Sequence, residues 1–85
     1  MAASREEVFE RVKEVLTEQL GIDEGEVTEE ASFTEDLDAD SLDLVELIME
    51  LEDRFAVSFP TRAMVNIRTV DQLAQTVLTL RARAA

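Results

Sequence analysis

The sequence predicts an all-α fold, a small four-helix bundle with three main helices, one short helix and a long loop between the first and second helices. Apolar residues recur every three or four positions in three separate segments, the spacing that places them on one face of a helix. No segment alternates apolar and polar residues as a half-buried strand does. The length of 85 residues fits a single domain spanning residues 1–85.

The first main helix is expected to open at a capping box formed by Ser4 and Glu7, and to stop at Gly21. Residues 21–40 then form the long loop, because they carry few apolar side chains. The expected anchors of this loop are Ile22, Val27, Phe33 and Leu37.

The second helix is expected over residues 41–55, with Asp40 as its N-cap. Pro60 ends the following connection and starts a short helical turn through the sequence TRAMVNI, residues 61–67. Thr69 and Gln72 form another capping box, which opens the last helix. The buried side of that helix is expected to hold Val70, Leu73, Ala74, Val77, Leu78 and Leu80.

The second helix has two apolar faces when its residues are placed about 100° apart around the axis. The broad face is predicted core and holds Leu44, Leu47, Ile48, Leu51 and Phe55. The opposite face holds Leu42, Val45 and Met49, framed by Asp43, Glu46, Glu50, Glu52 and Asp53. An apolar ridge inside an acidic frame is typical of a partner-docking surface. The alternative is that these three residues pack against the long loop or the last helix of the same chain.

The net charge of −12 is concentrated in the middle of the chain. Residues 23–53 contain fourteen acidic side chains and no Lys or Arg, whereas five arginines and one aspartate follow. Such an anionic body repels nucleic acid and anionic membranes and attracts basic partners. Four of these arginines are interpreted as counterweights to the acidic helix within the chain: Arg62, Arg68, Arg81 and Arg83.

The chain has no Cys and no His, which excludes disulfides, thiolate–zinc sites, thiol nucleophiles and histidine acid–base chemistry. No segment resembles a signal peptide or a membrane span, so a soluble, cytoplasmic protein is expected. Asp36, Asp38 and Asp40 begin like a calcium loop, but Ser41 stands where that loop needs Gly and Leu47 where it needs Glu. No metal site and no enzymatic activity are predicted.

Ser41 lies in the first turn of the second helix, where free backbone N–H groups and the helix dipole favour a phosphate ester. The chain offers no histidine base that could make this serine a nucleophile. Two interpretations stay open from the residues alone: a serine that another enzyme modifies, or a serine that only caps its helix.

The segment DADSLDLVELIMELEDRF, residues 38–55, resembles the sequence around the modified serine of acyl carrier proteins, and the resemblance extends over nearly the whole chain. It implies that a phosphopantetheinyl transferase attaches 4′-phosphopantetheine from coenzyme A to Ser41, with Asp40 and Leu42 beside the arm. The arm would supply the thiol that the chain lacks. Acyl intermediates would then be held as thioesters and delivered to enzymes of fatty-acid, polyketide or related lipid biosynthesis.

The resemblance also assigns two further sets of residues. Asp40, Asp43, Glu46, Glu52 and Asp53 would meet basic patches of acyl-processing enzymes, together with the outward apolar residues Leu42, Val45 and Met49. The candidate lining for the acyl chain, all of which are also ordinary core candidates, is Leu44, Leu47, Ile48, Phe55, Met64 and Ile67.

The chain departs from the family pattern at Asp38, where many members have Gly, and in the short helix, which contains arginines and no acid. A monomer is expected. The alternatives are an aminoacyl or peptidyl carrier, and an acidic helical adaptor without a cofactor.

Overall fold

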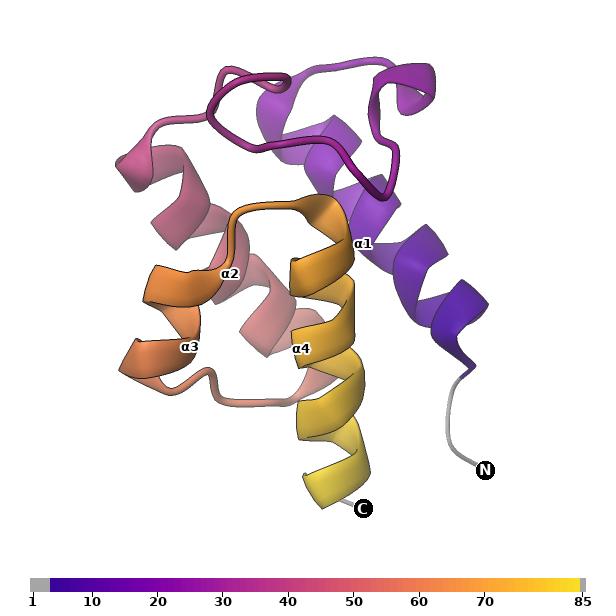
Figure 1. The fold of residues 1–85 in the computed structure, drawn as a ribbon. Coiled ribbons are helices and arrows are strands. Elements are labelled where there is room, and N and C mark those ends of the chain that lie inside the picture. The colour runs from indigo at the N-terminus through magenta and orange to yellow at the C-terminus, as the bar shows by residue number, and fades with distance from the viewer. Residues whose placement is uncertain (1–3, 85) are drawn as a thin grey trace.

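The computed structural model describes residues 4–84, and over this range the chain is built from helices and loops (Figure 1). The main helices are α1 (Arg5–Leu20), α2 (Ser41–Phe55) and α4 (Val70–Ala84), and the short helix is α3 (Thr61–Asn66). A single 3₁₀ turn, η1 (Glu24–Glu26), interrupts the long loop. The predicted all-α architecture with three main helices and one short helix is confirmed.

The predicted helix ends are set by local hydrogen bonds. The Ser4 hydroxyl accepts the Glu7 N–H at 3.2 Å, and Gly21 ends α1 in the left-handed region at φ 65°. Thr69 and Gln72 form the complete capping box of α4. The Thr69 hydroxyl accepts the Gln72 N–H at 3.3 Å, and the Gln72 side-chain amide oxygen accepts the Thr69 N–H at 3.2 Å. These side chains satisfy N–H groups that have no partner inside their own helix.

The core lies where α1 contacts both α2 and α4. It is built from the predicted apolar faces of the main helices, whose fully buried members are Val8, Val12, Val15, Leu16, Leu47, Ile48, Leu51, Val70, Leu73, Ala74 and Val77. Leu44, Leu78 and Leu80 were expected in this core but are only half-buried and pack against its outside. Leu44 belongs to the first turn of α2, and the two α4 leucines lie in the C-terminal half of their helix.

The loop between α1 and α2 is fastened to the start of α4 (Figure 1). The Phe33 N–H donates to the Arg68 carbonyl at 3.0 Å, the Val70 N–H to the Ala31 carbonyl at 3.1 Å, and the Asp71 N–H to the Glu29 carbonyl at 2.9 Å. Val27, Phe33 and Leu37 are buried as predicted, whereas Ile22 is half-buried. The loop is therefore an ordered cap on the bundle that fixes where α2 begins.

The same junction is held by charge. The Arg5 guanidinium at the start of α1 pairs with Glu29 of the loop at 2.6 Å and with Asp71 of α4. The hydrogen bond that Arg5 donates to the Glu29 carboxylate is the largest of the contributions that raise the pKa of Arg5 above its ordinary value, and the charge of Asp71 adds to it. Arg5 thus joins three segments that are far apart in the sequence.

Within residues 4–84, no helix combines the length and the apolar character that crossing a lipid bilayer requires.

Candidate functional site

Ser41 is the first residue of α2, and its side chain is exposed. The helix is capped by its neighbours: the Asp40 carboxylate accepts the Asp43 N–H at 2.9 Å, and the Asp43 carboxylate accepts the Asp40 N–H at 3.2 Å. The cap is therefore Asp40 and not Ser41. The Ser41 hydroxyl takes no part in this capping box, which leaves it accessible for the phosphodiester that a phosphopantetheine arm requires.

The residues before Ser41 alternate between core and solvent. Leu37 and Ala39 are buried, and the Ala39 N–H donates to the Phe33 carbonyl at 2.7 Å. Between them, Asp38 is exposed and adopts φ 54°, a left-handed conformation that favours Gly and is tolerated by Asp. This conformation explains how Asp38 can occupy a position where many family members have Gly. The buried Leu37 and Ala39 on either side of it anchor the backbone that leads to Ser41.

The outward face of α2 carries the predicted apolar ridge. Leu42 is 64% exposed, Val45 41% and Met49 61%. The alternative that these residues pack against the loop or the last helix is wrong. Leu42 is directly next to Ser41, so the ridge begins at the serine and continues along the helix.

The acidic residues that frame the ridge have different surroundings. Glu46 and Asp53 are exposed and belong to none of the ion pairs among the described residues. Asp43 is half-buried in the capping box, and the half-buried Glu52 accepts the Phe59 N–H at 2.8 Å. Within residues 4–84, Glu46 and Asp53 thus form no ion pair, whereas Asp43 and Glu52 also bind the backbone.

The fifth framing acid, Glu50, is paired within the chain. Arg54 donates to Glu50 at 2.9 Å and to Glu18 of α1 at 2.8 Å. These hydrogen bonds, the one to Glu50 first, raise the pKa of Arg54 above its ordinary value. The arginines interpreted as counterweights to this helix, Arg62, Arg68, Arg81 and Arg83, form no ion pair among residues 4–84, so it is Arg54 that pairs with the acidic helix.

The candidate acyl lining does not surround the pocket between α3 and α4. Leu47, Ile48, Phe55 and Ile67 are buried, and Leu44 and Met64 are half-buried beside them in one continuous cluster. The surface pocket of about 410 Å³ between α3 and α4 shares none of these six residues. Their position suits both core packing and contact with an acyl chain that enters the bundle, so their role in the lining stays a prediction.

Two features of the site were missed by sequence reasoning. Val65 on α3 is 71% exposed, although only its neighbours Met64 and Ile67 were considered. A rotation of about 100° per residue separates Val65 from Met64, which was a usable signal. The bond between Glu52 and the Phe59 N–H left no signal, because it joins a helix to a loop that returns to it only after folding.

Across residues 4–84 no three carboxylates gather in a way that could hold a metal ion.

Comparisons with known proteins agree with this geometry. A family model described as a phosphopantetheine attachment site matches residues 10–77. The acyl carrier protein of Rubrobacter xylanophilus is 54% identical over 80% of this chain and 84% of its own length. That of Thermotoga maritima is 49% identical over 84% and 88%, respectively.

Solved structures give the same result. The crystal structure of an acyl carrier protein from Thermotoga maritima superposes with a TM-score of 0.83 at 31% identity, covering 95% of this chain and 94% of that one. An acyl carrier protein from Enterococcus faecalis gives a TM-score of 0.76 at 28% identity, covering 92% and 99%. The matched residues include Ser41 and all of α2. The chain is thus a carrier and not an enzyme, its cofactor is covalently attached 4′-phosphopantetheine, and it belongs to the acyl carrier protein family.

Proposed function

We propose that this chain carries acyl intermediates as thioesters on 4′-phosphopantetheine attached to Ser41. It would deliver them to enzymes of fatty-acid, polyketide or related lipid biosynthesis, acting as a cytoplasmic monomer. The observation that carries the proposal is the exposed Ser41 hydroxyl, which the Asp40–Asp43 capping box leaves unused at the start of α2.

The amino-acid composition shows which groups the cofactor supplies and which the protein supplies. The bound arm supplies the thiol that forms the thioester, because the chain contains no cysteine. The first turn of α2 offers backbone N–H groups and the positive end of the helix dipole near the phosphate. Asp40 and Leu42, the neighbours of Ser41, are the residues that a transferase would contact first.

The docking face of this function is the outward side of α2. Leu42, Val45 and Met49 would enter apolar contacts, and Glu46 and Asp53 would meet basic patches on phosphopantetheinyl transferase and acyl-processing enzymes. Asp40, Asp43 and Glu52 would add negative charge while keeping their structural hydrogen bonds. Charges of this kind speed up association by steering the partner, so their effect weakens as salt is added.

The test is the intact mass of the protein after incubation with coenzyme A and a broad-specificity phosphopantetheinyl transferase. We expect a gain of one phosphopantetheinyl group in the unmodified chain, and no gain in Ser41→Ala. Ser58→Ala is the matched control, because Ser58 is also exposed and its replacement should leave the gain intact. A gain that persists in Ser41→Ala, or none in folded wild-type protein with an active transferase, would contradict the proposal.

A further inference from the structure

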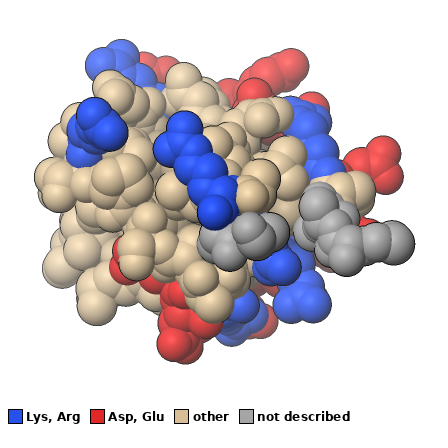
Figure 2. All heavy atoms as spheres, turned by 90° about the horizontal axis from the view of Figure 1, so that it is seen from below, with Lys and Arg blue, Asp and Glu red and all other residues tan. Residues whose placement is uncertain are grey.

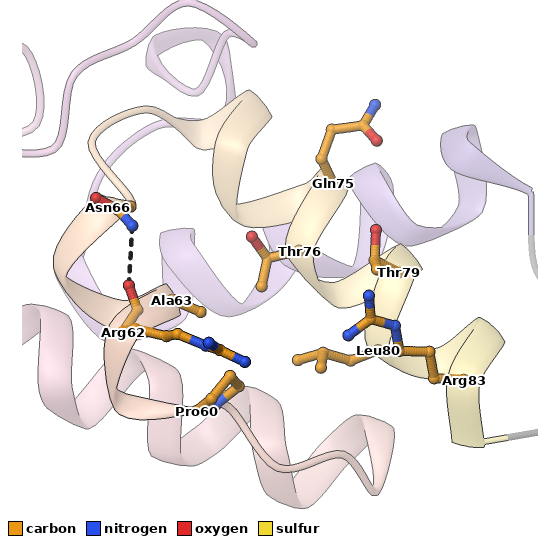
Figure 3. Close-up of a pocket in the computed structure, with 9 residues that line it drawn as sticks. All are labelled: Pro60, Arg62, Ala63, Asn66, Gln75, Thr76, Thr79, Leu80 and Arg83. Atoms are coloured by element: carbon orange, nitrogen blue, oxygen red, sulfur yellow. Dashed lines mark hydrogen bonds between the residues drawn. The ribbon is translucent and has the colours of Figure 1, made fainter.

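The pocket between α3 and α4 is lined by residues that the acyl carrier function does not use. Its volume is about 410 Å³. Arg62 of α3 and Arg83 of α4 stand on opposite walls, and Figure 3 shows both guanidinium groups over the same hollow. Pro60 and Leu80 supply apolar surface between them. Two cationic groups therefore flank an apolar patch.

The lining contains no acidic residue. Among the described residues the ion pairs use Arg5, Lys13 and Arg54, so neither Arg62 nor Arg83 pairs with a side-chain carboxylate of residues 4–84. Figure 2 shows the underside of the molecule, where Lys and Arg side chains are spread over the face and Asp and Glu lie mostly toward its rim. This local positive charge contrasts with the net charge of −12.

Hydrogen-bond donors of the pocket are available to a ligand. The two guanidinium groups are exposed and can each bind a carboxylate through a fork of N–H groups. Thr79 also lines the pocket from α4 and adds a hydroxyl, whereas Figure 3 shows the side chain of Gln75 directed away from the two guanidinium groups. Asn66 instead donates its side-chain amide to the Arg62 carbonyl at 3.0 Å, which steadies the α3 wall.

The net negative charge of the chain favours a short anionic ligand over an extended one in the pocket between α3 and α4. An extended polyanion such as nucleic acid or an anionic membrane would lie over the acidic parts of the surface as well, and a second copy of this chain would bring a further net charge of −12. A short acidic segment can stay within the pocket, since added charges beyond about 8 Å are screened at physiological salt. The apolar patch of Pro60 and Leu80 favours a peptide with an apolar side chain between its carboxylates over a bare inorganic anion.

We propose that the pocket between α3 and α4 binds an acidic peptide segment of a partner protein. The carrier then has two docking sites of opposite charge: the acidic ridge of α2 and the arginine pocket of α3 and α4. A partner that carries both a basic patch and an acidic segment is bound in one orientation, because reversing it would bring like charges together. This pocket does not depend on where the cofactor is attached.

The experiment uses the full chain labelled with ¹⁵N and a short synthetic peptide that alternates glutamate and leucine. We expect the amide signals of Arg62, Thr79 and Arg83 to shift on titration, and the peptide with glutamine in place of glutamate to leave them unchanged. Arg62→Gln or Arg83→Gln should each weaken binding about threefold, and the double variant about tenfold, as removal of exposed guanidinium–carboxylate contacts does.

Arg11→Gln is the matched control, because Arg11 is exposed on α1 outside the pocket and its replacement changes the net charge equally. An equal loss of affinity in Arg11→Gln would overturn the proposal, and so would shifts that map outside the pocket or no binding of the acidic peptide at all. Saturating shifts of the same amides with inorganic phosphate alone, with no further gain from the peptide, would make this a small-anion site and would also overturn it. The helical circular dichroism of each variant shows that it is folded.

Discussion

Asp40 has two separable roles, as the cap of α2 and as a negative charge beside Ser41. Asp40→Ala removes the oxygen that accepts the Asp43 N–H at 2.9 Å, together with the charge. Asp40→Asn keeps an oxygen in the same place and removes only the charge. Comparing the two substitutions therefore separates the effect of the capping hydrogen bond from the effect of the negative charge.

The structure sets the magnitude of the change. Replacing an N-cap aspartate by alanine costs about 1 kcal/mol of folding free energy, whereas asparagine is among the best N-cap residues and should cost no more than about 0.5 kcal/mol. For a chain of 85 residues, a loss of about 1 kcal/mol lowers the melting temperature by roughly 4–8 °C. Asp40→Ala should therefore melt several degrees below Asp40→Asn.

Two assays complete the comparison. Helical circular dichroism during heating and in urea gives the stability of each variant. The rate of mass gain with coenzyme A and transferase at low salt gives the rate of modification, and we expect both variants to be modified more slowly because both lose the charge. Equal loss of stability in Asp40→Asn and Asp40→Ala would refute the reasoning, since the hydrogen bond would then not be the source of the stabilisation.

Further predictions concern stability and docking. Ala56 caps α2 at φ 54°, and Ala56→Gly should stabilise the fold by about 0.5–1 kcal/mol, because relief of the left-handed strain exceeds the extra chain entropy of glycine; the urea midpoint should rise at unchanged slope. Gly21→Ala is the reverse case at φ 65°, where an added Cβ meets nothing within 4 Å, so any loss of stability there arises from the backbone. Glu46→Lys should slow modification and acyl transfer at low salt without lowering the melting temperature, whereas Glu10→Lys, an exposed α1 position with the same change of charge, should not; equal slowing by both would point to net charge alone. Raising the ionic strength from low to moderate should raise the melting temperature, because it screens the repulsion among the fourteen acids of residues 23–53; a flat response would show that these charges are already balanced.

The sequence was informative wherever a structure is set by neighbouring residues. Asp40, Gly21 and the Thr69–Gln72 capping box could be read directly, because a helix end is determined within about one turn. The exposed ridge of α2 followed from helical periodicity in the same way. Each of these predictions used residues no more than one helical segment apart.

Contacts between distant segments could not be predicted. The backbone bonds of Ala31 and Phe33 to Val70 and Arg68 involve main-chain groups that every residue has, so no side-chain pattern marks them. The same limit applies to the arginines. Arg62 and Arg83 were interpreted as counterweights to the acidic helix, but they lie across the α3–α4 pocket from one another, a placement that only the fold creates.

Because the loop is hydrogen-bonded to α4, movement of the protein backbone adds little to the distance over which the carrier can move an acyl group. Moving the start of α2 away from the bundle would break three backbone hydrogen bonds to residues 68–71 and expose the buried Phe33 and Leu37. Each such bond, once lost without replacement, costs roughly 1 kcal/mol. Exposing the apolar surface of these side chains to water costs further free energy. With the arm on Ser41 as proposed, an acyl group travels between enzymes by rotation about the bonds of the arm, while the protein provides a rigid base for that motion.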